Sequence, residues 1–154
     1  MPAEGTDLPV FHDLPGGGIS VHGTSVALEG RGLLILGSSG AGKSSLAAHL
    51  IALGARLVAD DLTLIRPVPD RAELGLWRRE DGPKALELRG LGLCHPPVCD
   101  TAPLMGVLLL APSAARLPEQ EILTLCGRPV PLWRHPYGFD LAAKLWLWAR
   151  ERRE

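Results

Sequence analysis

The fold of this chain is decided by the stretch Leu33-Leu34-Ile35-Leu36-Gly37-Ser38-Ser39-Gly40-Ala41-Gly42-Lys43-Ser44. Its last eight residues match the pattern G-x-x-x-x-G-K-[ST], which is typical of a phosphate-binding loop. The four apolar residues before the loop predict a buried strand, and residues 44–53 carry leucines at helical spacing. Gly54 stands where such a helix would end. The order strand, glycine-rich loop and helix is the setting that this motif requires.

The residue types of the loop suit the binding of a nucleotide. Small residues let backbone N–H groups curl around phosphate oxygens, and the start of the following helix adds partial positive charge. Lys43 would reach the β- and γ-phosphates, and the Ser44 hydroxyl would ligate a magnesium ion, Mg2+. The alternative is a glycine-rich turn that only opens a helix. The expected nucleotide-binding residues are Gly37, Ser38, Ser39, Gly40, Ala41, Gly42, Lys43, Ser44 and Ser45.

Two adjacent carboxylates follow the apolar strand expected at residues 56–59, namely Asp60 and Asp61. Neighbouring side chains of an extended strand point in opposite directions, so one carboxylate can face a metal ion and the other an incoming hydroxyl. The competing interpretation is that one aspartate caps a turn and the other is solvated. Beside a phosphate-binding loop, the functional interpretation is favoured.

Two further sets of residues are weak signals when taken alone. Glu87 and Arg89 alternate with leucines and can share one face of a short strand before a glycine-containing turn. A surface ion pair also explains them. His22 precedes the loop by one expected hairpin, and alone it is an ordinary structural histidine.

The rest of the chain predicts a single α/β domain with a mixed β-sheet and few helices. Residues 1–18 are rich in proline and glycine and predict a loose segment, so the domain is expected at 19–154. Residues 67–84 predict an exposed hairpin or loop. Residues 140–150 predict an amphipathic helix with Leu141, Leu145 and Trp148 on one face. Further strands are expected at 19–22, 25–29, 62–65, 85–88 and 104–110.

Composition limits the function classes. The chain has 154 residues and a net charge of −1, so no diffuse basic field attracts nucleic acid or anionic lipid. No apolar stretch reaches the roughly 20 residues of a spanning helix, and the N-terminus lacks the features of a secretory signal. We therefore expect a soluble, cytoplasmic protein that binds neither membrane nor nucleic acid. Three cysteines without a CxxC pair are expected to be reduced thiols rather than zinc ligands.

Four motifs in series resemble the C-terminal catalytic domain of HPr kinase/phosphorylase over about residues 19–112. They are Val21-His22-Gly23, the loop at 37–44, Leu57-Val58-Ala59-Asp60-Asp61 and Glu87-Leu88-Arg89-Gly90-Leu91-Gly92. The resemblance implies a P-loop kinase domain similar to the nucleotide-binding half of phosphoenolpyruvate carboxykinase. It also implies ATP and Mg2+ as cofactors and a serine on the phosphocarrier protein HPr as the acceptor.

The same resemblance implies roles for individual residues. Asp60 matches the family's catalytic carboxylate, which is a base toward the serine hydroxyl and an acid in the reverse reaction with inorganic phosphate. His22 matches a histidine near the transferred phosphate, and Arg89, Gly90 and Gly92 match a signature turn. The implied catalytic residues are Asp60, His22 and Lys43, and the implied magnesium ligands are Ser44, Asp61 and Glu87.

The chain also departs from the family's pattern. Full-length members carry an N-terminal domain, so the chain is expected to resemble the short form that lacks it. The family's basic, flexible C-terminal loop has one candidate here, residues 127–131 with Arg134. We expect an HPr-like phosphocarrier protein as partner and a homo-oligomeric state. Two other functions stay open: an ATP-binding sensor module without phosphoryl transfer, and a small-molecule kinase.

Overall fold

The computed structural model describes residues 8–111 and 121–151. Two helices lie in these ranges, α1 (Lys43–Ala52) and α2 (Leu141–Glu151). The strands are β1 (His12–Asp13), β2 (Ile19–His22), β3 (Thr24–Leu28), β4 (Arg31–Gly37), β5 (Arg56–Ala59), β6 (Leu62–Pro67), β7 (Leu74–Trp77), β8 (Leu86–Leu88), β9 (Gly92–Cys94), β10 (Thr101–Leu110), β11 (Glu121–Leu125) and β12 (Arg128–His135).

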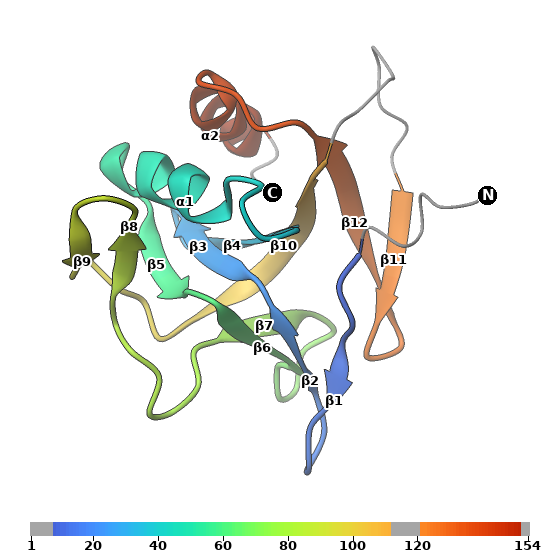
Figure 1. The fold of residues 1–154 in the computed structure, drawn as a ribbon. Helices are drawn as coiled ribbons and strands as arrows, with labels where there is room; N and C mark the ends of the chain where they lie inside the picture. The colour runs from blue at the N-terminus through green and yellow to red at the C-terminus, as the bar shows by residue number, and fades with distance from the viewer. Residues whose placement is uncertain (1–7, 112–120, 152–154) are drawn as a thin grey trace.

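Strand β10 connects the two parts of the main sheet (Figure 1). Its first three residues pair antiparallel with β7, which continues through β6 and β2 to β1. Its second half pairs in parallel with β4 on one side and β12 on the other. Beyond β4 follow β3 and β5, both in antiparallel pairings, and β11 pairs with β12. Strands β8 and β9 form a separate hairpin. The expected mixed sheet with few helices is confirmed.

Strand β4 is buried on both faces because it separates two hydrophobic cores. Leu34 and Leu36 belong to the core between the two parts of the sheet, whereas Leu33 and Ile35 belong to the core under the helices. The two helices lie on the same side of β3, β4 and β10 (Figure 1). Side chains alternate along a strand, so a strand covered on both faces is apolar at every position. This explains the uninterrupted apolar run before the loop.

Helix α1 begins and ends within one residue of the expected helix, but the buried face of α2 differs from expectation. Its buried residues are Leu141, Ala142, Trp146 and Ala149. Leu145 and Trp148, which the spacing assigned to the core face, are only partly buried. Trp146 is held in place because its indole Nε1 donates to the Leu50 carbonyl at 3.3 Å. This contact links α2 to α1 and turns the helix toward Trp146.

The prediction of an exposed segment at residues 67–84 is wrong for its central part. Residues 74–77 form β7, in which Leu74 and Leu76 are buried. This strand lies between β6 and β10 in the sheet. It is short and lies among charged, proline and glycine residues, so its sequence resembles a loop. Its burial comes from pairing with β10, which lies far along the chain.

Residues 127–131 with Arg134, the one candidate for the family's flexible loop, do not form such a loop. Residues 128–135 form β12, and Val130 is 5% exposed. The prolines of this segment argue against a strand in the sequence, because a proline lacks the N–H that a paired strand donates. Pairing with β10 begins only at Leu132, after the last of these prolines.

The N-terminal segment is partly ordered against the domain. Strand β1 pairs with β2, and Leu8 and Phe11 pack against the core between the two parts of the sheet. The loose segment predicted for 1–18 is therefore not loose throughout its described part. Residues 1–7, and residues 152–154 at the end of the expected domain, lie outside the described residues.

Candidate active site

The phosphate-binding loop lies between the end of β4 and the start of α1. Gly40 and Gly42 have φ angles of 83° and 111°, a region that other residues seldom occupy. Helix α1 has no acidic residue in its first turn. The positive end of the helix is thus not offset by a carboxylate of its own first turn, which favours an anion there.

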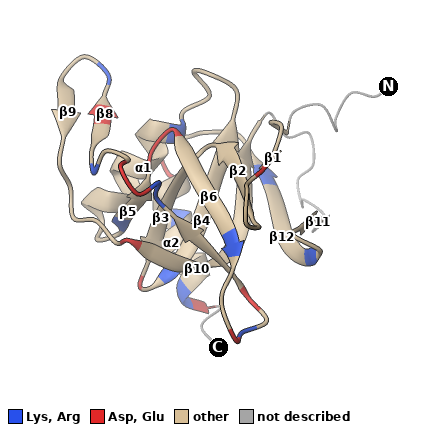
Figure 2. Cartoon of the chain, turned by 90° about the horizontal axis from the view of Figure 1, so that it is seen from below, with Lys and Arg blue, Asp and Glu red and all other residues tan. Residues whose placement is uncertain are grey.

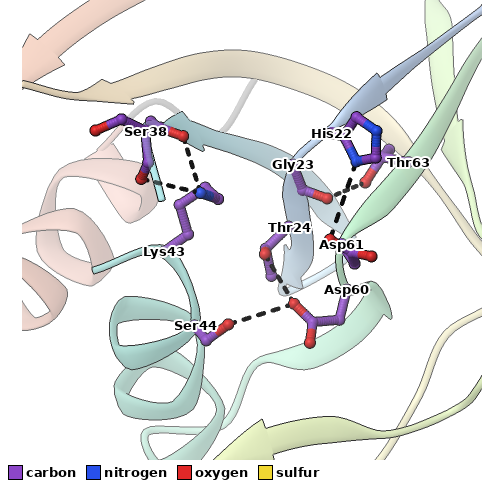
Figure 3. Close-up of polar contacts among 10 residues, drawn as sticks. His22, Gly23, Thr24, Ser38, Lys43, Ser44, Asp60, Asp61 and Thr63 are labelled. Atoms are coloured by element: carbon purple, nitrogen blue, oxygen red, sulfur yellow. Dashed lines mark hydrogen bonds and ion pairs between the residues drawn. The ribbon is translucent and has the colours of Figure 1, made fainter. Parts of the chain in front are cut away.

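Lys43 folds back over the loop (Figure 3). Its ammonium donates to the carbonyl of Gly37 at 2.8 Å and to that of Ser38 at 3.2 Å. Among the described residues, none of the ion pairs involves Lys43. Its charge is therefore held at the loop by neutral groups and is available to an anion.

Asp60 is fixed by two hydroxyls from different elements. Its Oδ1 atom accepts a hydrogen bond from Thr24 Oγ1 at 2.9 Å and lies 3.5 Å from Ser44 Oγ. Thr24 belongs to β3, Ser44 to α1, and Asp60 follows β5 directly. Thr24, which is 1% exposed, is not among the residues that the sequence motifs predict for the site. One sequence feature could have indicated Thr24 as a site residue. It is a polar residue that follows the His22-Gly23 motif directly and begins a strand whose later residues are mostly apolar.

Asp61 points to the other side of the site. It has a φ of 73°, and the Leu62 N–H donates to the Asp60 carbonyl at 2.8 Å. This is a three-residue γ-turn of the rare, strained kind. The Asp61 carboxylate is exposed and lies 4.0 Å from His22 Nδ1, as Figure 3 shows. Strain of this type is found where function requires a side chain in one direction.

The turn is anchored to the β2–β3 corner. The Gly23 N–H donates to the Asp61 carbonyl at 3.0 Å. The Thr63 hydroxyl donates to the Gly23 carbonyl at 3.0 Å and contacts the Ser25 hydroxyl at the same distance, and both hydroxyls are buried. These bonds hold the backbone of His22 and Asp61 together.

A cleft of about 770 Å³ opens between the loop, the aspartates and the β8–β9 hairpin. It gathers most of the residues that sequence analysis singled out. Its lining includes Ser39, Gly40, Gly42, Lys43, Ser44, Ser45, Asp60, Asp61, Glu87, Arg89 and Gly90. His22 does not line the cleft but contacts Asp61, which does. Gly37 and Ser38 do not line it either, but their carbonyls accept hydrogen bonds from Lys43. Ala41 and Gly92 do not line it.

The donor set of the cleft fits a magnesium ion bound together with phosphates. Ser44 and Asp60 offer a hydroxyl and a carboxylate oxygen at one place, and Mg2+ prefers oxygen ligands. In the described part of the chain, no three His, Cys, Asp or Glu side chains form a metal site by themselves. Phosphate and water oxygens would therefore complete the coordination, as is usual for this ion.

None of the three cysteines lines the cleft, and all three are free thiols. Burial raises the pKa of the Cys126 thiol, which lies in the β11–β12 turn. Within the described ranges, no helix is long and apolar enough to cross a membrane.

Comparison with solved structures shows the fold. The chain superimposes on the structure of the Hpr(Ser) kinase/phosphatase from Coxiella burnetii with a TM-score of 0.76, covering 87% of this chain and 90% of that one. The two sequences are 22% identical. The chain therefore shares the fold of that structure.

Two curated relatives are HPr kinase/phosphorylases. The chain is 43% identical over 89 residues to the HPr kinase/phosphorylase of Lachnoclostridium phytofermentans, which covers 58% of this chain and 27% of that protein. It is 44% identical over 77 residues to the HPr kinase/phosphorylase of Treponema pallidum (strain Nichols), over 50% of this chain and 24% of that protein. The chain thus matches about a quarter of the length of these relatives.

Among known protein families, residues 17–96 match the one described as HPr Serine kinase C-terminal domain. This range contains all four motifs and about half of the chain. The resemblance drawn from the motifs is confirmed: the chain belongs to the HPr serine kinase C-terminal domain family.

Proposed function

We propose that this chain is an ATP-dependent protein serine kinase domain that phosphorylates an HPr-like phosphocarrier protein and can reverse the reaction by phosphorolysis. The observation that carries the proposal is the contact between Ser44 of the phosphate-binding loop and Asp60. It brings the carboxylate pair to the loop where the γ-phosphate would lie. The names of the curated relatives support the same reaction.

The loop side of the cleft binds the nucleotide. Backbone N–H groups of the loop and the Lys43 ammonium hold the phosphates, and Ser44 and Asp60 hold magnesium. When bound, the ion neutralises charge on the phosphates. Glu87 lines the cleft from β8 and belongs to the same proposed magnesium site. The contact with Ser44 thus supports the magnesium role for Asp60, rather than for Asp61 as the resemblance implies.

The open side of the cleft receives the acceptor. The Asp61 carboxylate is exposed and is neighboured by His22, so an incoming serine hydroxyl can reach it. Asp61 accepts the serine proton while the serine oxygen bonds to the γ-phosphorus, and the bond to the β–γ bridging oxygen breaks to release ADP. In phosphorolysis, an oxygen of inorganic phosphate bonds to the phosphorus of the phosphoserine while the bond from that phosphorus to the serine oxygen breaks. Asp61 passes the proton of the attacking phosphate to the serine oxygen, so the products are serine and pyrophosphate.

The test compares Asp60→Asn and Asp61→Asn. Asparagine is close in size to aspartate and also tolerates a positive φ, so neither change disturbs the γ-turn. Transfer from labelled ATP to purified HPr is measured in both directions, together with ATP affinity at several magnesium concentrations. Asp61→Asn should keep magnesium-dependent ATP affinity within a few-fold and lose most transfer. Asp60→Asn should need a higher magnesium concentration than the wild type to reach the same ATP affinity.

Asp81→Asn, at an exposed position outside the cleft, is the matched control and should behave as wild type. The reverse pattern, with magnesium dependence altered only in Asp61→Asn, would restore the roles that the resemblance implies. Failure of the wild-type protein to phosphorylate any HPr-like acceptor would contradict the kinase proposal and favour an ATP-binding sensor module.

A further inference from the structure

The connection between β12 and α2, residues 136–140, lies against the phosphate-binding loop. A Cβ atom added to Gly42 would lie 2.9 Å from Cγ of Tyr137 and 3.2 Å from its Cβ and Cδ1. Contacts this short leave no room for a side chain, so the Tyr137 ring packs directly on the loop backbone. Tyr137 lies outside the family match, which ends at residue 96.

The sheet topology places this ring at the ligand-binding edge. Strands β4, β10 and β12 are parallel, and Leu110 is in register with Gly37 on one side and His135 on the other. The Ala111 N–H continues this pairing by donating to the His135 carbonyl at 3.1 Å. Ligands of open α/β sheets bind outside the carboxyl ends of parallel strands. The loop and Tyr137 share that edge.

The strand order fixes the direction in which a nucleotide lies. Asp60 follows β5, two strands from β4 on one side, and Tyr137 follows β12, two strands from β4 on the other. The γ-phosphate belongs at the aspartates, where the acceptor enters. The base therefore leaves the loop at the opposite end. Gly42 lines the cleft and also contacts Tyr137, so the ring lies against the loop just outside the lining of the cleft.

Tyr137 has the exposure that a stacking platform needs. Gly42 covers part of the side chain, yet 42% of the residue remains accessible. Phe139, two residues along the same connection, is 88% exposed and adds apolar surface.

We propose that Tyr137 is the platform on which the base of the bound nucleoside triphosphate stacks, an inference that rests on the proposed nucleotide binding. Every base has a π-face, so stacking on an aromatic ring tolerates different bases. The platform thus contributes affinity for a nucleoside without selecting adenine over guanine.

The experiment measures the calorimetric affinity of the full chain for ATP, GTP and inorganic tripolyphosphate, each with magnesium. Tyr137→Ala should weaken ATP and GTP binding by roughly 5- to 150-fold, the loss expected for one stacked base, and leave tripolyphosphate binding unchanged. Tyr137→Phe should retain wild-type affinities because stacking does not use the hydroxyl. Ile122→Ala removes an exposed apolar side chain on β11 and is the matched control.

Lys43→Ala separates this inference from the proposed function, because it should lower the affinity for all three ligands. An equal loss of tripolyphosphate and ATP binding in Tyr137→Ala would show that the ring only supports the loop and would overturn the platform. Unchanged ATP binding in Tyr137→Ala would overturn it as well. Wild-type protein that binds none of the three ligands would overturn the proposed function itself.

Discussion

Asp60 and Asp61 are adjacent in the chain but face different partners. Asp60 ends the extended path of β5 and meets the hydroxyls of Thr24 and Ser44. The positive φ of Asp61 turns the chain at once, so its carboxylate lies near His22. Two residues of the same type thus acquire different environments because of one backbone angle. The buried Thr24 hydroxyl keeps the first of them in place.

Removal of the Thr24 hydroxyl should impair the magnesium site more than the fold. Thr24→Val keeps the shape of the side chain but takes away the donor to Asp60, a hydrogen bond to a charged group of about 1.5–3 kcal/mol. We expect transfer at limiting magnesium to fall by about tenfold or more, with partial recovery at high magnesium. Transfer rates over a magnesium series, with a thermal melt of each protein, check this.

Thr24→Ser is the control for this prediction because it keeps the donor. A loss of transfer in Thr24→Val that magnesium does not relieve, with a matching fall in thermal stability, would indicate a purely structural role.

At the scale of elements, β10 holds the site together. It pairs with β7, β4 and β12, so it joins the strand that carries the loop to both parts of the sheet. The Leu76 side chain of β7 packs over Gly32 at the start of β4, where an added Cβ would lie 2.7 Å from Leu76 Cδ1. The strand absent from the sequence prediction is therefore part of the support of β4.

Truncation of Leu76 tests whether β7 is a core strand. Leu76 is fully buried, so Leu76→Ala should lower the free energy of unfolding by about 2–5 kcal/mol. Leu91, which is 86% exposed at the tip of the β8–β9 hairpin, is the matched control. Leu91→Ala should change the free energy of unfolding by less than about 0.5 kcal/mol. Urea denaturation provides both values. Equal, small effects would contradict the burial of β7.

At the scale of the molecule, charge is spread rather than concentrated. Lys and Arg (blue) and Asp and Glu (red) are scattered over the strands and turns in Figure 2, in keeping with a net charge of −1. Phosphate affinity therefore depends on the local arrangement at the loop. Since the loop joins β4 to α1, and both contribute to the core under the helices, a nucleotide bound as proposed would be coupled to the folded state.

Magnesium and ATP should consequently stabilise the whole domain. A ligand that binds only the native state at 100 times its Kd adds about 2.7 kcal/mol to the free energy of unfolding. We expect a rise in the melting temperature with ATP and magnesium, and little rise in Lys43→Ala. Thermal melts over an ATP series measure this. Lys84→Ala, which changes an exposed lysine outside the cleft, is the control and should show the same rise in melting temperature as the wild type. An equal rise in Lys43→Ala would contradict nucleotide binding at the loop.

The features that sequence alone determined are local. The apolar run before Gly37, the loop and α1 depend on residues within one turn or a few bonds, so spacing and residue type are sufficient to predict them. The acidic pair after β5 and the Glu87 and Arg89 motif were found in the same way, and the cleft brings all of them together.

The features that depend on distant contacts became visible only in the folded chain. Strands β7 and β12 are buried by β10, which their own proline, glycine and charged residues do not reveal. The Thr24–Asp60 bond joins residues 36 positions apart, and the Tyr137–Gly42 contact joins residues still farther apart. The direction of Asp61 follows from a strained turn anchored to Gly23. A sequence pattern records which groups are present, whereas the environment that divides their roles is created by segments that meet only in the fold.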